Sequence, residues 1–512
     1  KMPLFCNCKK HRNVDSNAVD NAINDVLSSL CCCGCEKKCT RCVNLVQDPS
    51  FEARTFDWIT SGVFFTDNSV FEGAIQAALG PGIASIYQEV SLRGVNGCPL
   101  LFSFNAFADI SPESDENSGI LIAEVSWLDE NFNFIGLGLR MLVPADRLYN
   151  TSRITFVAQT DVVPKNAAYA KVAFSKGEGL SESGDIIYLD YIILAPMAGK
   201  NLVRNGGFEA NLTNWIADPA TSFVSAFDES LVDSGNAFTS SDGQLFQDIS
   251  IRQLVHRTPF LLSFAVEGEG PVSLSVRVDW ISQAGATIGN GLTASIPEQT
   301  LPNQQNYLTY VFVTTPPVPG TAFARIIFDA DVPTTEDLVR IDQVLFVPVL
   351  STNLVTNPSF EIQQNGQIVG WNQSLVTLLE RDDVYEGSFD VGIGETGGAL
   401  WQDIELDCPE GHCFFFSAGL GFRQTSVEAI YGTAQIKVIW LDRYDNELGI
   451  GLNLIVDRTL VSNIVNSMSW VPYIGITDPA PEGTAKARIL FTKTDSPQGF
   501  VEIDNVVFAR IV

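Results

Sequence analysis

Cysteine is the residue type with the clearest chemistry in this sequence, and most of it lies at one end. Eight of the eleven cysteines fall within the first 42 residues. They are Cys6, Cys8, Cys31, Cys32, Cys33, Cys35, Cys39 and Cys42. Thiolates at this density can bind zinc, exchange disulfides or link one molecule to another.

The spacing of these cysteines favours links between molecules. Cys39 and Cys42 have the CxxC spacing of a zinc ligand pair, but a tetrahedral zinc site would leave several of the eight thiols over. Three adjacent cysteines point in different directions and do not easily pair with one another. This segment is too short for a hydrophobic core of its own, and the domains that follow are large enough to fold without disulfides. Its cysteines are therefore better suited to joining subunits than to stabilising a single chain. We therefore expect disulfides between chains, with zinc as the alternative.

Three cysteines lie outside this segment. Cys408 and Cys413 flank the sequence PEGH in an expected loop, and we predict that they close it as a local disulfide. Cys98 lies in the matching loop of an earlier part of the chain. In an oxidising setting an odd cysteine suggests pairing between molecules, so Cys98 joins the candidates for intermolecular disulfides. A buried, unreactive thiol is the alternative.

The residue types that carry most catalysis are sparse. The histidines are His11, His256 and His412, and none lies in a recognisable nucleophile motif. Glycoside hydrolysis needs two carboxylates held across a cleft, which a sequence cannot place. We expect no enzyme activity.

The charge balance narrows the partners. With 60 acidic and 31 basic side chains the net charge is −29, which repels nucleic acids and anionic lipids. The first 42 residues hold seven basic and four acidic side chains, so a basic segment precedes an acidic body. No apolar run approaches the roughly 18–20 residues of a membrane helix, and the start has no apolar signal core. We expect no membrane span and no nucleic acid; the basic segment suits docking on a neighbouring copy, unless the imbalance is incidental.

An internal repeat of about 150 residues must position these side chains. The sequence NLVQDPSFE at 44–52 returns as NLVRNGGFE at 201–209 and as NLVTNPSFE at 353–361. The copies close on YLDYIIL, RIDQVLF and EIDNVVF. A period of this length is a whole domain. The predicted organisation is a connector at 1–42 and three repeats at 43–198, 199–350 and 351–512.

The repeats predict an all-β protein. Short runs rich in Val, Ile and Phe alternate with polar residues and stop at Gly, Pro, Asn or Asp, which is the pattern of strands. Each copy should therefore be an antiparallel β-sandwich. The exception is 15–30, where apolar residues follow one helical stripe behind an Asp or Ser cap, and there we predict one helix.

The order NLVxNxxFE at the start and ID(N/Q)V at the end of a copy resembles the jelly-roll domains of the carbohydrate-binding-module superfamily. The resemblance implies three tandem jelly rolls and leaves their function open. It also implies structural calcium between the first and last strands, since calcium prefers several hard oxygen ligands. The implied ligand pairs are Glu52 with Asp190, Glu209 with Asp342, and Glu361 with Asp504. The alternative is that each Glu caps backbone amides and each Asp closes a strand end.

Sugar binding would need exposed aromatic side chains. Six tryptophans recur at matched positions of the three copies, which favours a packing role. They are Trp58, Trp215, Trp371, Trp127, Trp280 and Trp440. Trp401 and Trp470 lack Trp counterparts and are the better candidates for a ligand face.

Residues 6–42 carry CxC, a short apolar helix and a second cysteine cluster in that order. This order resembles the cysteine-rich N-terminal regions of spore-coat and exosporium proteins of endospore-forming bacteria. We therefore expect a structural, self-assembling protein of a bacterial cell or spore surface, in a fibre or lattice cross-linked through these cysteines. Other surface proteins and glycans are further expected partners. The alternative is a multivalent carbohydrate-binding surface protein, a lectin or adhesin.

Overall fold

The computed structural model describes residues 42–512, except 54–56, 69, 111–116, 151–152, 180–184, 227–228, 255–256, 302–306, 395, 424–432, 457–467 and 495–498. The helix expected at 15–30 and the cysteines before Cys42 lie outside the described residues. Each repeat forms a sandwich of two five-stranded antiparallel sheets, which confirms the predicted all-β class. No helix in the described ranges is long and apolar enough to cross a membrane.

The first domain contains β1 to β10. Its outer sheet has the order β1-β4-β9-β6-β7 and its inner sheet the order β2-β3-β10-β5-β8. The outer strands are β1 (Ile59–Ser61), β4 (Ala84–Ser91), β9 (Tyr169–Lys176), β6 (Leu121–Leu128) and β7 (Phe134–Val143). The inner strands are β2 (Val63–Thr66), β3 (Gln76–Leu79), β10 (Ile187–Pro196), β5 (Leu100–Ala108) and β8 (Ile154–Gln159).

The second domain repeats this order with β11 to β20. Its outer strands are β11 (Ile216–Asp218), β14 (Gly243–Ser250), β19 (Thr321–Asp331), β16 (Ser273–Ser282) and β17 (Thr287–Ile296). Its inner strands are β12 (Val224–Ala226), β13 (Asn236–Thr239), β20 (Leu338–Pro348), β15 (Phe260–Glu269) and β18 (Leu308–Val313).

The third domain has the same two sheets and one added hairpin, formed by β21 (Gln363–Gln364) and β22 (Gln367–Ile368). Its outer strands are β23 (Asn372–Ser374), β26 (Ala399–Glu405), β31 (Lys486–Lys493), β28 (Ala434–Leu441) and β29 (Glu447–Val456). Its inner strands are β24 (Thr377–Glu380), β25 (Phe389–Ile393), β32 (Phe500–Ala509), β27 (Phe415–Arg423) and β30 (Met468–Ile476).

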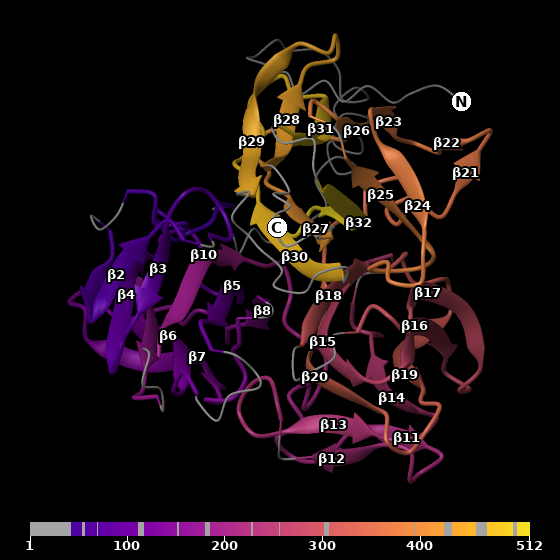
Figure 1. Ribbon diagram of the computed structural model, residues 1–512, viewed down its shortest axis with the longest axis horizontal. Coiled ribbons are helices and arrows are strands. Elements are labelled where there is room, and N and C mark those ends of the chain that lie inside the picture. The colour runs from indigo at the N-terminus through magenta and orange to yellow at the C-terminus, as the bar shows by residue number, and fades with distance from the viewer. Residues whose placement is uncertain are drawn as a thin grey trace, which may run out of the picture.

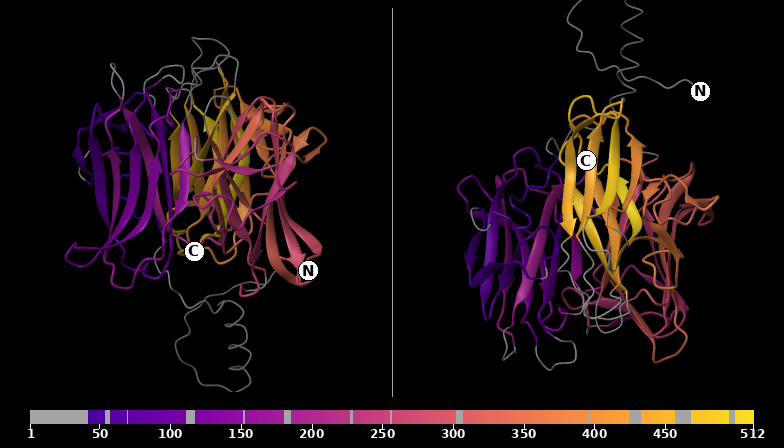
Figure 2. Two further views of the ribbon diagram at one scale, coloured as in Figure 1. Left: turned by 90° about the horizontal axis from the view of Figure 1, so that it is seen from below. Right: turned by 45° about the horizontal axis from the view of Figure 1, so that its top comes forward.

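The three sandwiches form a closed ring. Figure 1 shows them around a common centre, with β8, β18 and β30 nearest the middle, and these three strands contact one another. Figure 2 shows the strands of the three sandwiches running side by side. Every domain therefore touches both of the others, although only consecutive domains are joined along the chain.

Burial patterns reflect this arrangement. The outer strand β4 alternates between buried and more exposed residues, whereas the inner strand β5 is buried throughout. An alternating strand has one face in water, and a strand buried on both faces lies between two packed layers. The second layer is the ring centre, where one apolar cluster joins residues of all three domains, among them Val157, Val311 and Ile474.

A disulfide corrects two sequence predictions. Cys413 pairs with Cys42 across 371 residues, and not with Cys408. Cys413 is buried in the central cluster, whereas Cys408 is exposed in the same loop, so the two side chains lie in different environments. Cys42 was expected to link chains, but the ring brings it to Cys413 of its own chain. Cys98 is also disulfide-bonded, so it is not a buried free thiol.

Candidate functional sites at the domain seams and on the outer sheets

One turn in each domain builds the contact with a neighbouring domain. These turns, named knob turns here, lead into the second inner strand and comprise residues 70–75, 230–235 and 384–389. The knob turn of the first domain lies against the third domain, that of the second against the first, and that of the third against the second. Three equivalent seams result.

The predicted calcium ligands hold the knob turn of the first domain. The carboxylate of Asp190 accepts hydrogen bonds from the backbone amides of Phe71 and Glu72, both at 3.0 Å. Glu52 Oε1 accepts the amides of Ala74 at 2.7 Å and Ile75 at 2.9 Å. The Glu of the FE motif and the Asp of the last strand thus clamp one turn from its two ends.

The other two domains repeat this clamp. Asp342 Oδ2 accepts the amides of Leu231 and Val232, and Glu209 Oε1 those of Ser234 and Gly235. In the third domain Asp504 Oδ2 accepts the amide of Glu386, and Glu361 Oε1 those of Ser388 and Phe389. In each domain the Glu–Asp pair therefore holds the knob turn of that domain in place.

These hydrogen bonds engage the Oε1 atom of Glu52, Glu209 and Glu361. A carboxylate oxygen that accepts two N–H groups has used both of its lone pairs. Among the residues that the structure describes, no group of three or more His, Cys, Asp or Glu side chains is placed to hold a metal ion. The geometry is that of the alternative, in which Glu caps backbone amides, and calcium stays a prediction for experiment.

Each knob turn inserts an apolar side chain into the neighbouring domain. Phe71 is buried in the apolar core of the third domain, where its ring stacks on that of Tyr473 with centroids 4.2 Å apart. The Tyr473 hydroxyl donates to the Phe71 carbonyl at 3.0 Å. At the equivalent seam Tyr385 enters the core of the second domain, and its ring lies 4.3 Å from that of Tyr310.

An acidic residue beside each knob pairs with an edge strand of the neighbour. Ile455, on the edge strand β29, accepts the Gly73 amide at 2.8 Å and donates its own amide to Glu72 Oε1 at 3.1 Å. Ser295 on β17 makes the same two bonds with Gly387 and Glu386.

At the remaining seam Leu142 on β7 bonds Asp233 through both its carbonyl and its amide. The knob turns therefore cover edge-strand groups that would otherwise be open to pairing with another chain.

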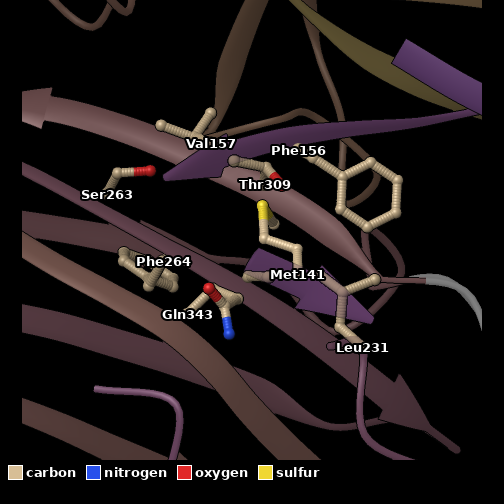
Figure 3. Close-up of a pocket in the computed structure, with 9 residues that line it drawn as sticks. Met141, Phe156, Val157, Leu231, Ser263, Phe264, Thr309 and Gln343 are labelled. Carbon is tan, nitrogen blue, oxygen red and sulfur yellow. The ribbon is translucent and has the colours of Figure 1, made fainter. Parts of the chain in front are cut away.

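The seam between the first and second domains is packed less fully. There Leu231 takes the position of Phe71 and Tyr385, so no ring stacks on Phe156. A gap with no room for a water molecule remains among side chains of both domains, including Met141 and Phe156 from the first. Figure 3 shows these side chains converging on the gap.

Burial raises the pKa values of the seam carboxyls. The pKa of Glu72 rises from 4.5 to about 7, mainly because burial disfavours its charge. Burial likewise raises the pKa values of Asp233 and Glu386. It raises those of Asp190, Asp342 and Asp504 well above the usual range. The seams therefore concentrate groups that bind protons more tightly in the folded state.

A second kind of site lies on the outer sheets. At one matched position each outer sheet carries an aromatic side chain: Tyr87, Phe246 and Trp401. Lys171 lies over the Tyr87 ring at 4.0 Å and Arg325 over the Phe246 ring at 4.6 Å. These are cation–π contacts on a face open to solvent.

The second and third domains both carry an ion pair beside this position, and in the second domain Arg325 binds Asp248 through two hydrogen bonds of 2.6 and 2.8 Å. In the third domain Arg488 binds Asp403 through two hydrogen bonds of 2.6 and 2.7 Å. Among the described residues no cation lies over the partly exposed Trp401 ring. Its face is therefore open to a ligand, with an ion pair beside it that offers both donors and acceptors.

The six recurring tryptophans are buried, which confirms their packing role. Trp127, for example, lies against Gly138, where an added Cβ would come within 2.3 Å of the indole. Trp470 was expected on a ligand face, but it is 5% exposed and its indole N–H donates to the Asp383 carbonyl. It is wrong as a ligand-face candidate because the ring of domains buries it beside Tyr385. Trp401 remains.

Comparison with known proteins gives structural likenesses only. No family model matches the sequence, and no curated protein matches it. Similar solved structures include the tandem CBM22-1–CBM22-2 domains of Paenibacillus barcinonensis Xyn10C, with 14% identity, 62% of this chain and 100% of that chain covered, and a TM-score of 0.27.

Two further solved structures are similar to parts of this chain. TmCBM61 in complex with β-1,4-galactotriose has 12% identity over 29% of this chain and 97% of that chain, with a TM-score of 0.23. The enzymatically active domain of bacteriophage CBA120 tailspike protein 4 has 22% identity over 31% of this chain and 21% of that chain, also with a TM-score of 0.23. The similar structures are thus mainly carbohydrate-binding modules of β-sandwich fold.

Proposed function

We propose that the protein is a non-catalytic, multivalent glycan-binding protein of a bacterial cell or spore surface. The observation that carries this proposal is the aromatic side chain at one matched position of all three outer sheets, with a basic side chain beside it on the neighbouring strand. Aromatic faces pack against the apolar faces of sugar rings, and charged side chains hydrogen-bond their hydroxyls.

The ring supports multivalent binding. Its outer sheets face away from the common centre, so the three matched positions lie on different sides of one body (Figure 1). Binding sites fixed on one body engage a polymer or a surface with a higher effective concentration than separate sites do. A net charge of −29 favours a neutral glycan over an acidic one.

Trp401 is the position expected to bind most strongly, because its ring is open. A glycan array probed with the full chain tests the proposal, followed by titration of the best neutral oligosaccharide. Trp401→Ala should weaken binding while leaving the fold intact. Tyr444→Ala is the matched control, since Tyr444 is 68% exposed on a hairpin of the same domain and away from that position. Equal losses in the two variants, or no binding on the array, would refute the proposal.

A structural role in a fibre or lattice is the second candidate. The observation that favours it is the seven cysteines that precede Cys42 in the sequence. If the chain polymerises, the contacts must come from surfaces outside the seams or from these cysteines. Native material that runs as a monomer in detergent without reductant would contradict covalent assembly.

A further inference from the structure

Two of the three seams lie between domains that the chain joins directly. The first connection runs through Gly199 and the second through Ser351. Two residues later, Asn201 and Asn353 open the next domain, and each side-chain oxygen accepts a backbone amide from that domain's last strand at 2.9 and 3.0 Å. Asn44 does the same in the first domain, accepting the amide of Leu194 at 2.9 Å.

The third seam has no such connection. By this alignment Cys42 occupies the position of Gly199 and Ser351, two residues before the asparagine. The residue joined to it on the other side is residue 41, not a residue of the third domain. No peptide linker therefore joins the third domain to Cys42.

The disulfide joins Cys42 to the third domain. Cys413 occupies the position of Pro99 and Pro259 and lies two residues before the inner strand β27. Those two prolines accept the amides of Met197 and Val349, at the ends of the two linked domains. The Cα atoms of Cys42 and Cys413 lie 5.7 Å apart, and the Cys413 side chain is 1% exposed.

We propose that the Cys42–Cys413 disulfide substitutes for the third linker, closes the ring covalently and makes the seam between the first and third domains responsive to redox conditions. The proposal is independent of glycan binding. Without the bond, the first and third domains are tethered only through the second, so their effective concentration at the seam falls. The other two seams keep their peptide linkers and should not respond.

The chemistry of opening is thiol–disulfide exchange. A dithiol attacks one sulfur, a mixed disulfide forms, and its second thiol completes the exchange. Two electrons and two protons pass to the cysteines, which become thiols, and the dithiol becomes a cyclic disulfide. Because Cys413 is buried, this reaction should be slow in the folded ring and fast once the seam opens.

Hydrogen exchange in the full chain tests the proposal, because each seam has its own reporter amides. Cys42→Ser places at this position the residue that Ser351 provides in the second linker. It should speed exchange at Gly73 and Ile455 at least tenfold, with little change at Gly387 and Ser295. Cys408→Ser, which changes a neighbouring exposed cysteine, is the control and should change neither seam.

Two outcomes would overturn the proposal: equal acceleration at all seams, or none at Gly73 and Ile455. A second measurement remains decisive even if Cys42→Ser does not fold. A protease site inserted after Gly199 is cut in the folded wild-type chain, and the products are separated in detergent. They should stay covalently joined until a dithiol is added. Separation without a dithiol would show that the disulfide does not close the ring.

Discussion

Replacing Phe71 by alanine is expected to weaken the contact between the first and third domains, and to leave the core of the first domain largely unchanged. The Phe71 ring is 1% exposed and packs in the core of the third domain. Truncation of a buried phenylalanine costs about 3–5 kcal/mol, through lost burial and the cavity left behind. Its stacking on Tyr473, at 4.2 Å between centroids, adds a coupling of about 0.5–1.5 kcal/mol.

The assay is denaturant unfolding of the full chain combined with hydrogen exchange at Gly73. A double-mutant cycle of Phe71→Ala and Tyr473→Ala isolates the stacking energy, because the two side chains contact each other across the seam. Phe64→Ala is the matched control: Phe64 lies in the same domain but is 42% exposed, so its loss should cost within about 0.5 kcal/mol. If Phe71→Ala costs no more than the control, or the cycle gives no coupling, the knob does not hold the seam.

Three further predictions test the seams. Burial raises the pKa of Glu72 to about 7 in the folded protein, so its contribution to stability is full below about 4.5 and is lost as the pH rises through about 7. The difference corresponds to about 3 kcal/mol, and Glu72→Gln should flatten the dependence of melting temperature on pH between 5 and 9. An unchanged slope would contradict this assignment. Leu231→Phe should raise the melting temperature by filling the gap beside Phe156, and a lower value would mean that the gap cannot admit a ring. A calcium chelator tests the calcium prediction: a cation held at Glu52 and Asp190 predicts a lower melting temperature on chelation, and an unchanged value would leave these carboxylates as acceptors of backbone amides alone.

The sequence was sufficient to predict the fold class and the repeat. Strand periodicity is a local signal, and the three copies of NLVxNxxFE mark where each repeat begins. The packing role of the recurring tryptophans was also predictable, because a residue kept at matched positions of diverged copies usually serves what the copies share. Trp401 stood out for the opposite reason, since its counterparts are Tyr87 and Phe246.

The seams could not be predicted because their partners are far apart in the sequence. Phe71 meets Tyr473 and Cys42 meets Cys413, and no local pattern connects residues at such separations. The recurrence of Glu52 and Asp190 was a true signal whose cause the sequence left open. Paired carboxylates at domain ends suit a metal ion, but they suit equally well a turn whose backbone amides need acceptors.

The clamped knob turn also explains why the three described domains close into a ring. A knob on one face and a receiving edge strand on another make a heterologous contact, which forms an open filament unless its rotation closes. Here it closes after three domains, because the knob of the first domain enters the third. All three knob turns in the described part of the chain are bound within the ring. Any assembly of this protein must therefore use surfaces outside the seams. Because the seams do not cover the exposed faces of the outer sheets, those faces remain available to a ligand within each ring.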